Sequence, residues 1–321
     1  MTFDSTTRRG FLTSTAALGL AGVACADHHA SPAEGGSATA EGPLFDISIA
    51  EWSVHNAIRK GKITNLDFPG LARDEFGLGA VEYVNSLFAD QRTDADYLAE
   101  LKGRCDDAGV KSLLIMIDRE GQVGAASESE RVKTAERHKR WIAAAAELGC
   151  HSVRVNASSD GSFFDQARYA ADGLVKLAEV AEPYGLNVLV ENHGGYSSHG
   201  AWLATVMELA GNPRVGTLPD FGNFRIKGRR NNPIETYDNY KGVAQLMPYA
   251  KAVSAKTNDF DEEGNETTLD YMRMMELVVA WGYRGYVGIE YEGRRLGEYE
   301  GVKASKVLLE RCREMLTSRY V

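Results

Sequence analysis

Residues 151–192 read HSVRVNASSDGSFFDQARYAADGLVKLAEVAEPYGLNVLVEN, with two short apolar runs on either side of a longer segment. The runs at 151–157 and 187–192 have the length and residue types of buried strands. Residues 166–185 instead space their apolar positions three and four apart, which is the period of a helix. Gly185 closes this segment, where a helix commonly ends in the left-handed conformation. The stretch therefore predicts a strand, a helix and a second strand in succession, the unit of an α/β fold.

The same alternation continues in both directions along the chain. Helical patterns recur at 94–109, 129–149 and 271–285, and further strand-like runs lie at 45–50, 79–84, 111–117, 215–220, 250–256 and 286–292. Eight strand–helix repeats in one chain match a (β/α)8 barrel, whose usual size is roughly 250 residues. An open doubly wound sheet is the alternative, but no GxGxxG follows the first strand. We therefore predict the α/β fold class and a single-domain (β/α)8 TIM barrel at residues 44–321.

The first 43 residues differ in kind from the rest of the chain. Arg8 and Arg9 precede a short run of small apolar residues, which resembles a twin-arginine export signal and is too short to remain as a transmembrane helix. We predict a signal peptide at 1–26 and a flexible, polar linker at 27–43. The mature protein is then periplasmic and has no transmembrane helix. Lipidation of Cys25 is the alternative, and would leave a membrane-anchored lipoprotein.

Composition narrows the classes of partner. The chain has 321 residues, of which 44% are apolar and 25% charged, so a sizeable core is available. Its net charge of −9 argues against binding nucleic acid, whose phosphates attract clustered Lys and Arg. The four cysteines show no paired spacing, so neither a disulfide framework nor a zinc ribbon is expected. The oligomeric state stays open, a homo-oligomer included.

Polar residues that end the predicted strands are the candidates for chemistry, because barrel enzymes act at the carboxyl ends of their strands. Glu191, Asp220 and Glu290 end three of these strands. Carboxylates that converge in a partly desolvated mouth repel one another, and a divalent cation resolves the conflict. Carboxylate oxygens are preferred ligands of Mg²⁺ and Mn²⁺. An additional imidazole or amide ligand would also allow Co²⁺ or Zn²⁺ to bind. The alternative is a purely structural role, in which each acid caps a helix or pairs with Lys or Arg.

The remaining strand-end residues are candidates for contacting a substrate. Lys256 is expected either to polarise a substrate oxygen or to pair with Glu290 or Asp220. His193 lies two residues beyond Glu191 and is expected to face the same mouth, whereas a capping role is favoured for His199. The other substrate-binding candidates are Glu51, Trp52, Glu82, Asn156 and Asn223. The basic residues from 227 to 230 are expected to be solvated loop charge.

Four segments together resemble the sugar isomerase/epimerase group of xylose isomerase-like TIM barrels over residues 45–318. They are VENHGG (190–195), LPDFGNF (218–224), VSAKTNDFDEEG (253–264) and GYVGIEYEG (285–293). The resemblance implies that Glu191, Asp220 and Glu290 hold the metal ion. The group's usual metal histidine is replaced by Ser254, so the fourth position falls to Ser254, His193, His199 or water, or else metal binding is weakened or lost. Asn223 likewise stands where a substrate-binding histidine is common.

The resemblance also implies a reaction. A metal ion that binds a sugar carbonyl and a neighbouring hydroxyl stabilises an enediolate, while Glu191 and Glu290 remove and return a proton. The expected function is thus an exported, metal-dependent sugar isomerase or epimerase with a small carbohydrate as its substrate. One alternative is a lyase or dehydratase that acts on a keto-sugar or 3-keto-glycoside through the same intermediate. Another is a barrel that binds carbohydrate without catalysis.

Overall fold

Eight parallel strands form one curved sheet, in the order β6-β5-β4-β3-β2-β1-β10-β9. The structure is a computed structural model that describes residues 42–320. The predicted signal peptide, the linker up to residue 41 and Cys25 lie outside the described residues. The strands are β1 (Asp46–Ala50), β2 (Ala80–Val84), β3 (Lys111–Met116), β4 (Ser152–Val155), β5 (Asn187–Glu191), β6 (Val215–Leu218), β9 (Val253–Thr257) and β10 (Tyr286–Tyr291).

Two backbone bridges join the ends of this sheet. Thr217 pairs with Ala250 and Asp220 pairs with Ser254, both in parallel, which places β6 beside β9. The Ser254 amide donates to the Pro219 carbonyl at 2.9 Å. The strands therefore meet around a closed circuit, and the predicted single-domain (β/α)8 TIM barrel is confirmed.

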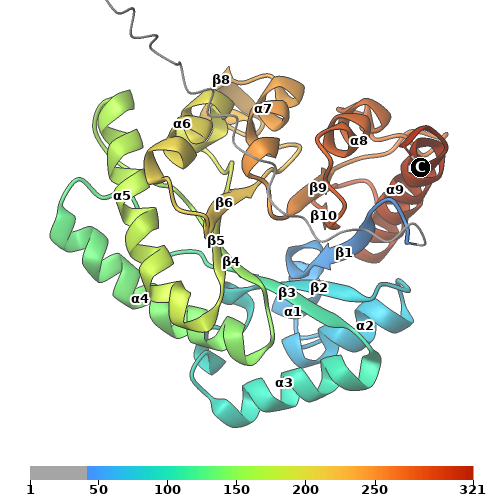
Figure 1. Cartoon of the computed structure of the whole chain (residues 1–321). Helices are drawn as coiled ribbons and strands as arrows, with labels where there is room; N and C mark the ends of the chain where they lie inside the picture. The colour runs from blue at the N-terminus through green and yellow to red at the C-terminus, as the bar shows by residue number, and fades with distance from the viewer. Residues whose placement is uncertain (1–41, 321) are drawn as a thin grey trace, which may run out of the picture. The chain divides into compact units, whose positions relative to one another are not determined.

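The connecting helices lie outside the strands (Figure 1). Asp94 begins α3 by accepting the Tyr97 amide, and Gly109 ends it with φ +60. Gly185, which the sequence predicts to close its helix, is also left-handed, with φ +70, and ends the short 3-10 turn Glu182–Tyr184 that follows the helix at 163–181. The helices are α1 (His55–Arg59), α2 (Phe68–Asp74), α3 (Ala95–Ala108), α4 (Glu128–Glu147), α5 (Phe163–Ala181), α6 (Gly200–Ala210), α7 (Asn239–Leu246), α8 (Tyr271–Ala280) and α9 (Glu298–Tyr320).

A two-stranded hairpin interrupts the alternation between β6 and α7. It consists of β7 (Arg225–Arg229) and β8 (Asn232–Thr236), which pair in antiparallel fashion. The sequence predicts only a charged loop here. Its strands are missed because they are almost fully exposed, so neither face carries the apolar alternation that marks a buried strand.

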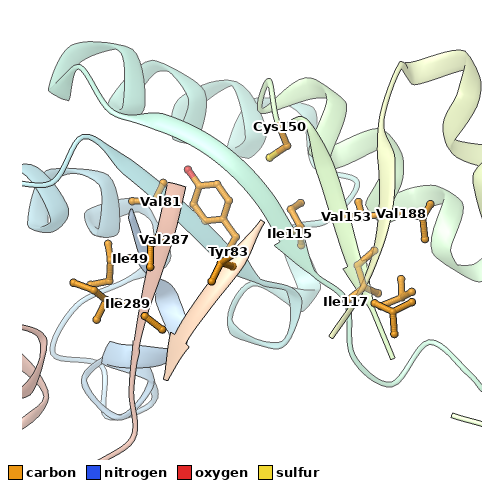
Figure 2. Close-up of a cluster of buried hydrophobic side chains, with 14 of the residues drawn as sticks. Ile49, Val81, Tyr83, Ile115, Ile117, Cys150, Val153, Val188, Val287 and Ile289 are labelled. Atoms are coloured by element: carbon orange, nitrogen blue, oxygen red, sulfur yellow. The ribbon is translucent and has the colours of Figure 1, made fainter. Parts of the chain in front are cut away.

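Alternate residues of each strand serve two different environments. One set packs outward against the helices as a large apolar cluster, which Figure 2 shows for Ile49, Val81, Ile115, Val153 and Val287. The other set faces the barrel interior, where the apolar cluster is small: Ala50, Val84, Leu114, Met116, Leu189, Leu218 and Ala252. The rest of that interior set is polar or charged, and it includes Glu82, Arg154, Ser254, Lys256 and Glu290. Charge is therefore concentrated inside this barrel.

None of the helices formed by residues 42–320 combines the length and apolar character that spanning a bilayer requires.

Candidate functional site

Three buried carboxylates converge at the carboxyl ends of the strands. Glu191 is the last residue of β5, Asp220 follows β6, and Glu290 lies near the end of β10. One oxygen from each lies within 4.8 Å of the other two, and the three side chains come from residues that are 0%, 0% and 5% exposed. We call these three residues the acidic triad. The structure thus brings together the acids that strand position alone selects in the sequence.

Two cations from the chain lie among these acids. The Lys256 ammonium is 3.1 Å from Glu290 Oε1, 3.4 Å from Asp220 Oδ2 and 3.5 Å from Glu292 Oε1. On the other side of the triad, the Arg154 guanidinium binds the Glu191 carboxylate. Both cations are almost completely buried, so they compensate charge that water cannot reach. The ion-pair alternative for Lys256 is therefore realised.

Arg154 is a site residue that the sequence analysis misses. It also donates to Asp118 Oδ1 at 2.8 Å, so it links the ends of β3 and β5. The signal that marks it is a charged side chain in the short buried strand SVRV, at a position whose neighbours on the same strand face the core. A charge in such a place requires a buried partner of opposite sign.

Two polar side chains tie the triad together. Ser254 Oγ lies 3.0 Å from Glu290 Oε2 and 3.2 Å from Asp220 Oδ2, so its single proton can be donated to either acid. Asn223 donates from Nδ2 to Glu191 at 2.7 Å and accepts from Lys256 at 3.3 Å. Asn223 is thus in contact with the triad and fixes the positions of the groups around it.

The turn after β6 fixes Asp220. Its Oδ1 accepts the backbone amides of Gly222 and Asn223 at 2.7 and 2.8 Å. Asn192 accepts the Asp220 amide at 2.7 Å and donates to the Asp220 carbonyl at 2.9 Å. The hydrogen bonds between β5 and β6 stop where these strands end, and this reciprocal pair continues the link. The Asn192 side chain thus positions Asp220 by holding the Asp220 backbone.

The acids of the triad differ in protonation. Burial raises the pKa of Asp220 to about 8; the Lys256 charge opposes this rise, whereas the charges of Glu290 and Glu191 add to it. Burial also raises the pKa of Glu290. Burial acts on Glu191 in the same direction, but Arg154, His193 and Lys256 outweigh it and hold the Glu191 pKa below its usual range. One acid is thus kept ionised while two are held towards the neutral form.

The triad has the donor atoms of a divalent cation site. Three carboxylate oxygens within 4.8 Å of one another form a hard ligand set of the kind that Mg²⁺ and Mn²⁺ prefer. The raised pKa values of Asp220 and Glu290 show that their ionised forms are destabilised in the protein, and a bound cation would stabilise those forms. Among residues 42–320, no histidine joins this group.

The contacts of the three candidates for a fourth ligand distinguish them from one another. His193 is exposed, and His199 uses Nδ1 to accept the Trp202 amide at 3.2 Å, which caps α6. The His199 ring also packs 4.3 Å from that of Tyr237. Ser254 is the candidate that touches the triad, so the oxygen at the usual histidine position is the neutral donor available there.

Two candidate substrate contacts, Glu51 and Glu82, are hydrogen-bonded to groups inside the protein. Glu51 is 0% exposed and accepts from Asn65 at 2.6 Å and from the Val84 amide at 2.9 Å. Glu82 is 1% exposed and accepts from Ser48 at 2.6 Å inside the barrel. Neither carboxylate is open to a ligand in the mouth. Glu51 directly follows β1 and is held by Asn65 and Val84, whereas Glu82 lies in the middle of β2 and is held by Ser48 of β1.

Trp52 lies at the rim of the mouth and is already in contact with protein groups. Its Nε1 donates to Glu292 at 2.7 Å, and the His55 ring stacks on it at 4.4 Å between centroids. Arg230, from the hairpin, binds the same Glu292 carboxylate and the Asn258 side chain. Trp52 therefore positions Glu292, and Arg230 attaches the hairpin to the rim, although its sequence context indicates only solvated charge.

Asn156 and His193 line a cavity of about 450 Å³ on the opposite side of the mouth. Asn156 donates to Asp118 Oδ1 at 2.7 Å, and Asp118 in turn pairs with Arg154. Both residues are predicted from the sequence to face a substrate, and the cavity places them next to the network that holds Glu191.

Comparisons with known proteins agree with this architecture. A family model described as "Xylose isomerase-like TIM barrel" matches residues 72–315. The structure of 3-keto-D-glucoside 4-epimerase from E. coli is 20% identical, with a TM-score of 0.57 over 85% of this chain and 100% of that chain. A xylose isomerase-like TIM barrel protein from Mycobacterium smegmatis, in complex with magnesium, is 16% identical, with a TM-score of 0.62 over 86% and 98%. At such identities, these two likenesses show the fold.

A curated relative matches a shorter part of the chain. The C-glycoside deglycosidase alpha subunit of Arthrobacter globiformis is 41% identical over 64 residues. The match spans 19% of this chain and 18% of the relative's length.

Proposed function

This chain belongs to the xylose isomerase-like TIM barrel family, and on that premise we propose that it is an enzyme that moves a proton at a carbon next to a sugar carbonyl. The observation that carries the proposal is the convergence of the buried carboxylates Glu191 and Glu290 with Asp220 at the carboxyl ends of the strands, where one oxygen of each lies within 4.8 Å of the others. Two carboxylates that converge in one site are suited to accept a proton on one side of a substrate and supply one on the other.

We assign the steps of proton transfer and charge stabilisation to four residues. Glu191, kept ionised beside Arg154, accepts the proton from carbon, and Glu290, held towards its neutral form, donates a proton in return. We assign to the Lys256 ammonium the stabilisation of negative charge on the substrate oxygen, because hydrogen-bond donors that are fixed in advance stabilise such charge strongly. Asn223 forms hydrogen bonds with both the Glu191 and the Lys256 side chains and so fixes their relative positions.

A divalent ion has a defined place in this proposal. It would be held by Glu191, Asp220 and Glu290, with Ser254 as a neutral oxygen, and when bound it polarises the substrate carbonyl. The donor set supports Mg²⁺ or Mn²⁺ over softer ions.

The substrate is proposed to be a free or oxidised sugar. The proposed export signal supports this choice, because phosphorylated sugars are scarce outside the cytoplasm. We assign isomerisation or epimerisation as the reaction. Elimination from a keto-glycoside is the second candidate, and it is favoured by the match of 64 residues to a C-glycoside deglycosidase subunit. The two reactions share the first proton removal.

Proton exchange tests the proposal directly. The protein is incubated with keto-sugars in D₂O, with and without Mn²⁺, and deuterium at the carbon beside the carbonyl is followed by NMR. We expect exchange that Glu191→Gln and Glu290→Gln each abolish, and that Glu276→Gln, on the outer surface of α8, leaves intact. Retained connectivity indicates an isomerase or epimerase, whereas loss of an aglycone indicates a lyase. Near-native exchange in either site variant would contradict the assigned roles.

A further inference from the structure

The cavity beside Asn156 has a feature that proton transfer at the triad does not use. It lies at the carboxyl ends of β3, β4 and β5, and its walls include Ile117, Arg119, Gln122, Asn156 and His193. Its volume of about 450 Å³ is large enough for one sugar ring. We call it the Arg119 cavity.

Arg119 adopts an unusual backbone conformation at the wall of this cavity. Its φ of +63 is the only positive φ of a non-glycine residue among residues 42–320. Side chains with a Cβ disfavour this region, and such strain is concentrated at sites where the chain must present a side chain to a ligand. Arg119 directly follows Asp118. The Asp118 side chain binds Arg154, whereas the Arg119 side chain lines the cavity, and the strained backbone lies between the two.

The Arg119 charge is not compensated by the protein. Arg119 is exposed, and within residues 42–320 its guanidinium makes no hydrogen bond or ion pair, so water is what solvates its charge. The neighbouring carboxylate, Glu120, is engaged by Arg140 at 2.6 Å and by Trp141 at 2.9 Å. Both acids next to Arg119 in sequence thus have other cations, Arg154 for Asp118 and Arg140 for Glu120, and Arg119 and Glu120 both line the cavity.

The same cavity contains an unmet hydrogen-bond acceptor. Asn156 Oδ1 is buried and has no partner among the described residues, while Nδ2 donates to Asp118. A buried carbonyl without a donor is rare, because it loses its hydrogen bonds to water without replacement. Because this oxygen is closed to solvent, a ligand hydroxyl supplies the missing donor only when the Asn156 amide turns its oxygen towards the cavity.

We propose that the Arg119 cavity is the binding site for a carboxylate-bearing sugar, with Arg119 holding the carboxylate and Asn156 Oδ1 accepting a sugar hydroxyl. A guanidinium matches a carboxylate through two parallel hydrogen bonds, which a neutral sugar cannot form. The inference rests on the proposed function, because Asn156, Asp118 and Arg154 connect this cavity to Glu191. It names the substrate class as sugar acids.

Binding and stability together test this assignment. D-glucuronate and D-glucose, a matched acidic and neutral pair, are titrated into the full chain by calorimetry. We expect glucuronate to bind about tenfold more tightly or better, and Arg119→Gly to remove that preference. The same variant should unfold at a higher temperature than the wild type, because glycine accepts φ +63 without strain. Arg119→Lys should keep part of the preference. Arg168→Gln, at an exposed position of α5, should change neither quantity.

Three results would overturn the assignment. Arg119→Gly that raises the unfolding temperature but leaves glucuronate affinity unchanged would make the residue purely structural. Equal affinity for the two probes would exclude carboxylate recognition. Absence of binding by either probe, while neutral keto-sugars still exchange their proton, would refute the inference and leave the proposed function in place. Conversely, Arg119-dependent binding without any proton exchange would support the inference and refute the proposed function.

Discussion

The Lys256 ammonium lies 3.1 Å from Glu290 Oε1, a carboxylate of the acidic triad. The same ammonium is 3.4 Å from Asp220 Oδ2. Both acids therefore have a counter-charge built into the chain. A divalent ion that enters the triad meets a positive charge already in contact with two of its three carboxylates, so the lysine opposes metal binding.

Removing this lysine is expected to strengthen metal binding. In Lys256→Met the two acids lose their counter-charge, and Mn²⁺ becomes the cation that stabilises them. We expect Mn²⁺ to raise the unfolding temperature of this variant by several degrees more than that of the wild type. Calorimetric titration with Mn²⁺ gives the affinities. The control is Lys241→Met, on α7 and outside the triad. An equal or weaker response in Lys256→Met would show that the lysine does not compete with the ion.

Removing Arg154 is expected to destabilise the fold. Arg154→Met leaves Glu191 buried without its cation, and the loss of one partner from a buried pair costs about 3–5 kcal/mol of unfolding free energy. Urea unfolding at neutral pH measures the change. The double variant Arg154→Met/Glu191→Gln removes the stranded charge and should recover part of the loss. Equal destabilisation in the single and double variants would indicate that the pair contributes through packing and not through charge.

The stability of the protein should depend on pH through Glu51. Burial raises the pKa of Glu51 from 4.5 to about 8, against the opposing effect of its hydrogen bonds from Val84 and Asn65. For an acid whose pKa is raised in the folded state, the stabilising contribution is complete below the unfolded pKa near 4.5 and is lost as the pH rises through about 8.

Glu51→Gln isolates this effect, because the amide cannot ionise. We expect the free energy of unfolding of the wild type to fall between pH 5 and 8, by about 1.4 kcal/mol per pH unit at most. The variant should show a flatter profile and gain relative to the wild type as the pH rises. Parallel pH profiles in chemical denaturation would show that Glu51 is not the group responsible. Glu298→Gln, at a half-buried position of α9, is the control.

Much of the barrel can be predicted from residue order alone. Apolar runs such as 187–192 alternate with helical patterns, and glycines such as Gly109 stand where helices end. These signals are local, since a strand or a helix end is encoded within a few residues. Strand position also selects the acidic triad, because parallel strands of a barrel present their carboxyl ends at one rim.

The pairings inside the site belong to the tertiary structure. Trp52 and Glu292 are hydrogen-bonded across 240 positions of sequence, and Arg154 reaches Glu191 across 37. Spacing in the chain carries no record of such contacts. The exposed hairpin of β7 and β8 was missed for a related reason, since without burial its strands have no apolar pattern to detect.

Burial is the remaining quantity that residue order does not supply. Glu51 and Asn156 both end a strand, yet Glu51 is sealed by Asn65 and Val84 whereas Asn156 lines a cavity. Whether an acid is ionised, whether an acceptor is left without a donor, and whether Arg119 faces a ligand depend on desolvation and on neighbours distant in sequence. The chain's pattern thus specifies a barrel with acids at its mouth, and the folded packing assigns each polar group its partner, its charge and its access to substrate.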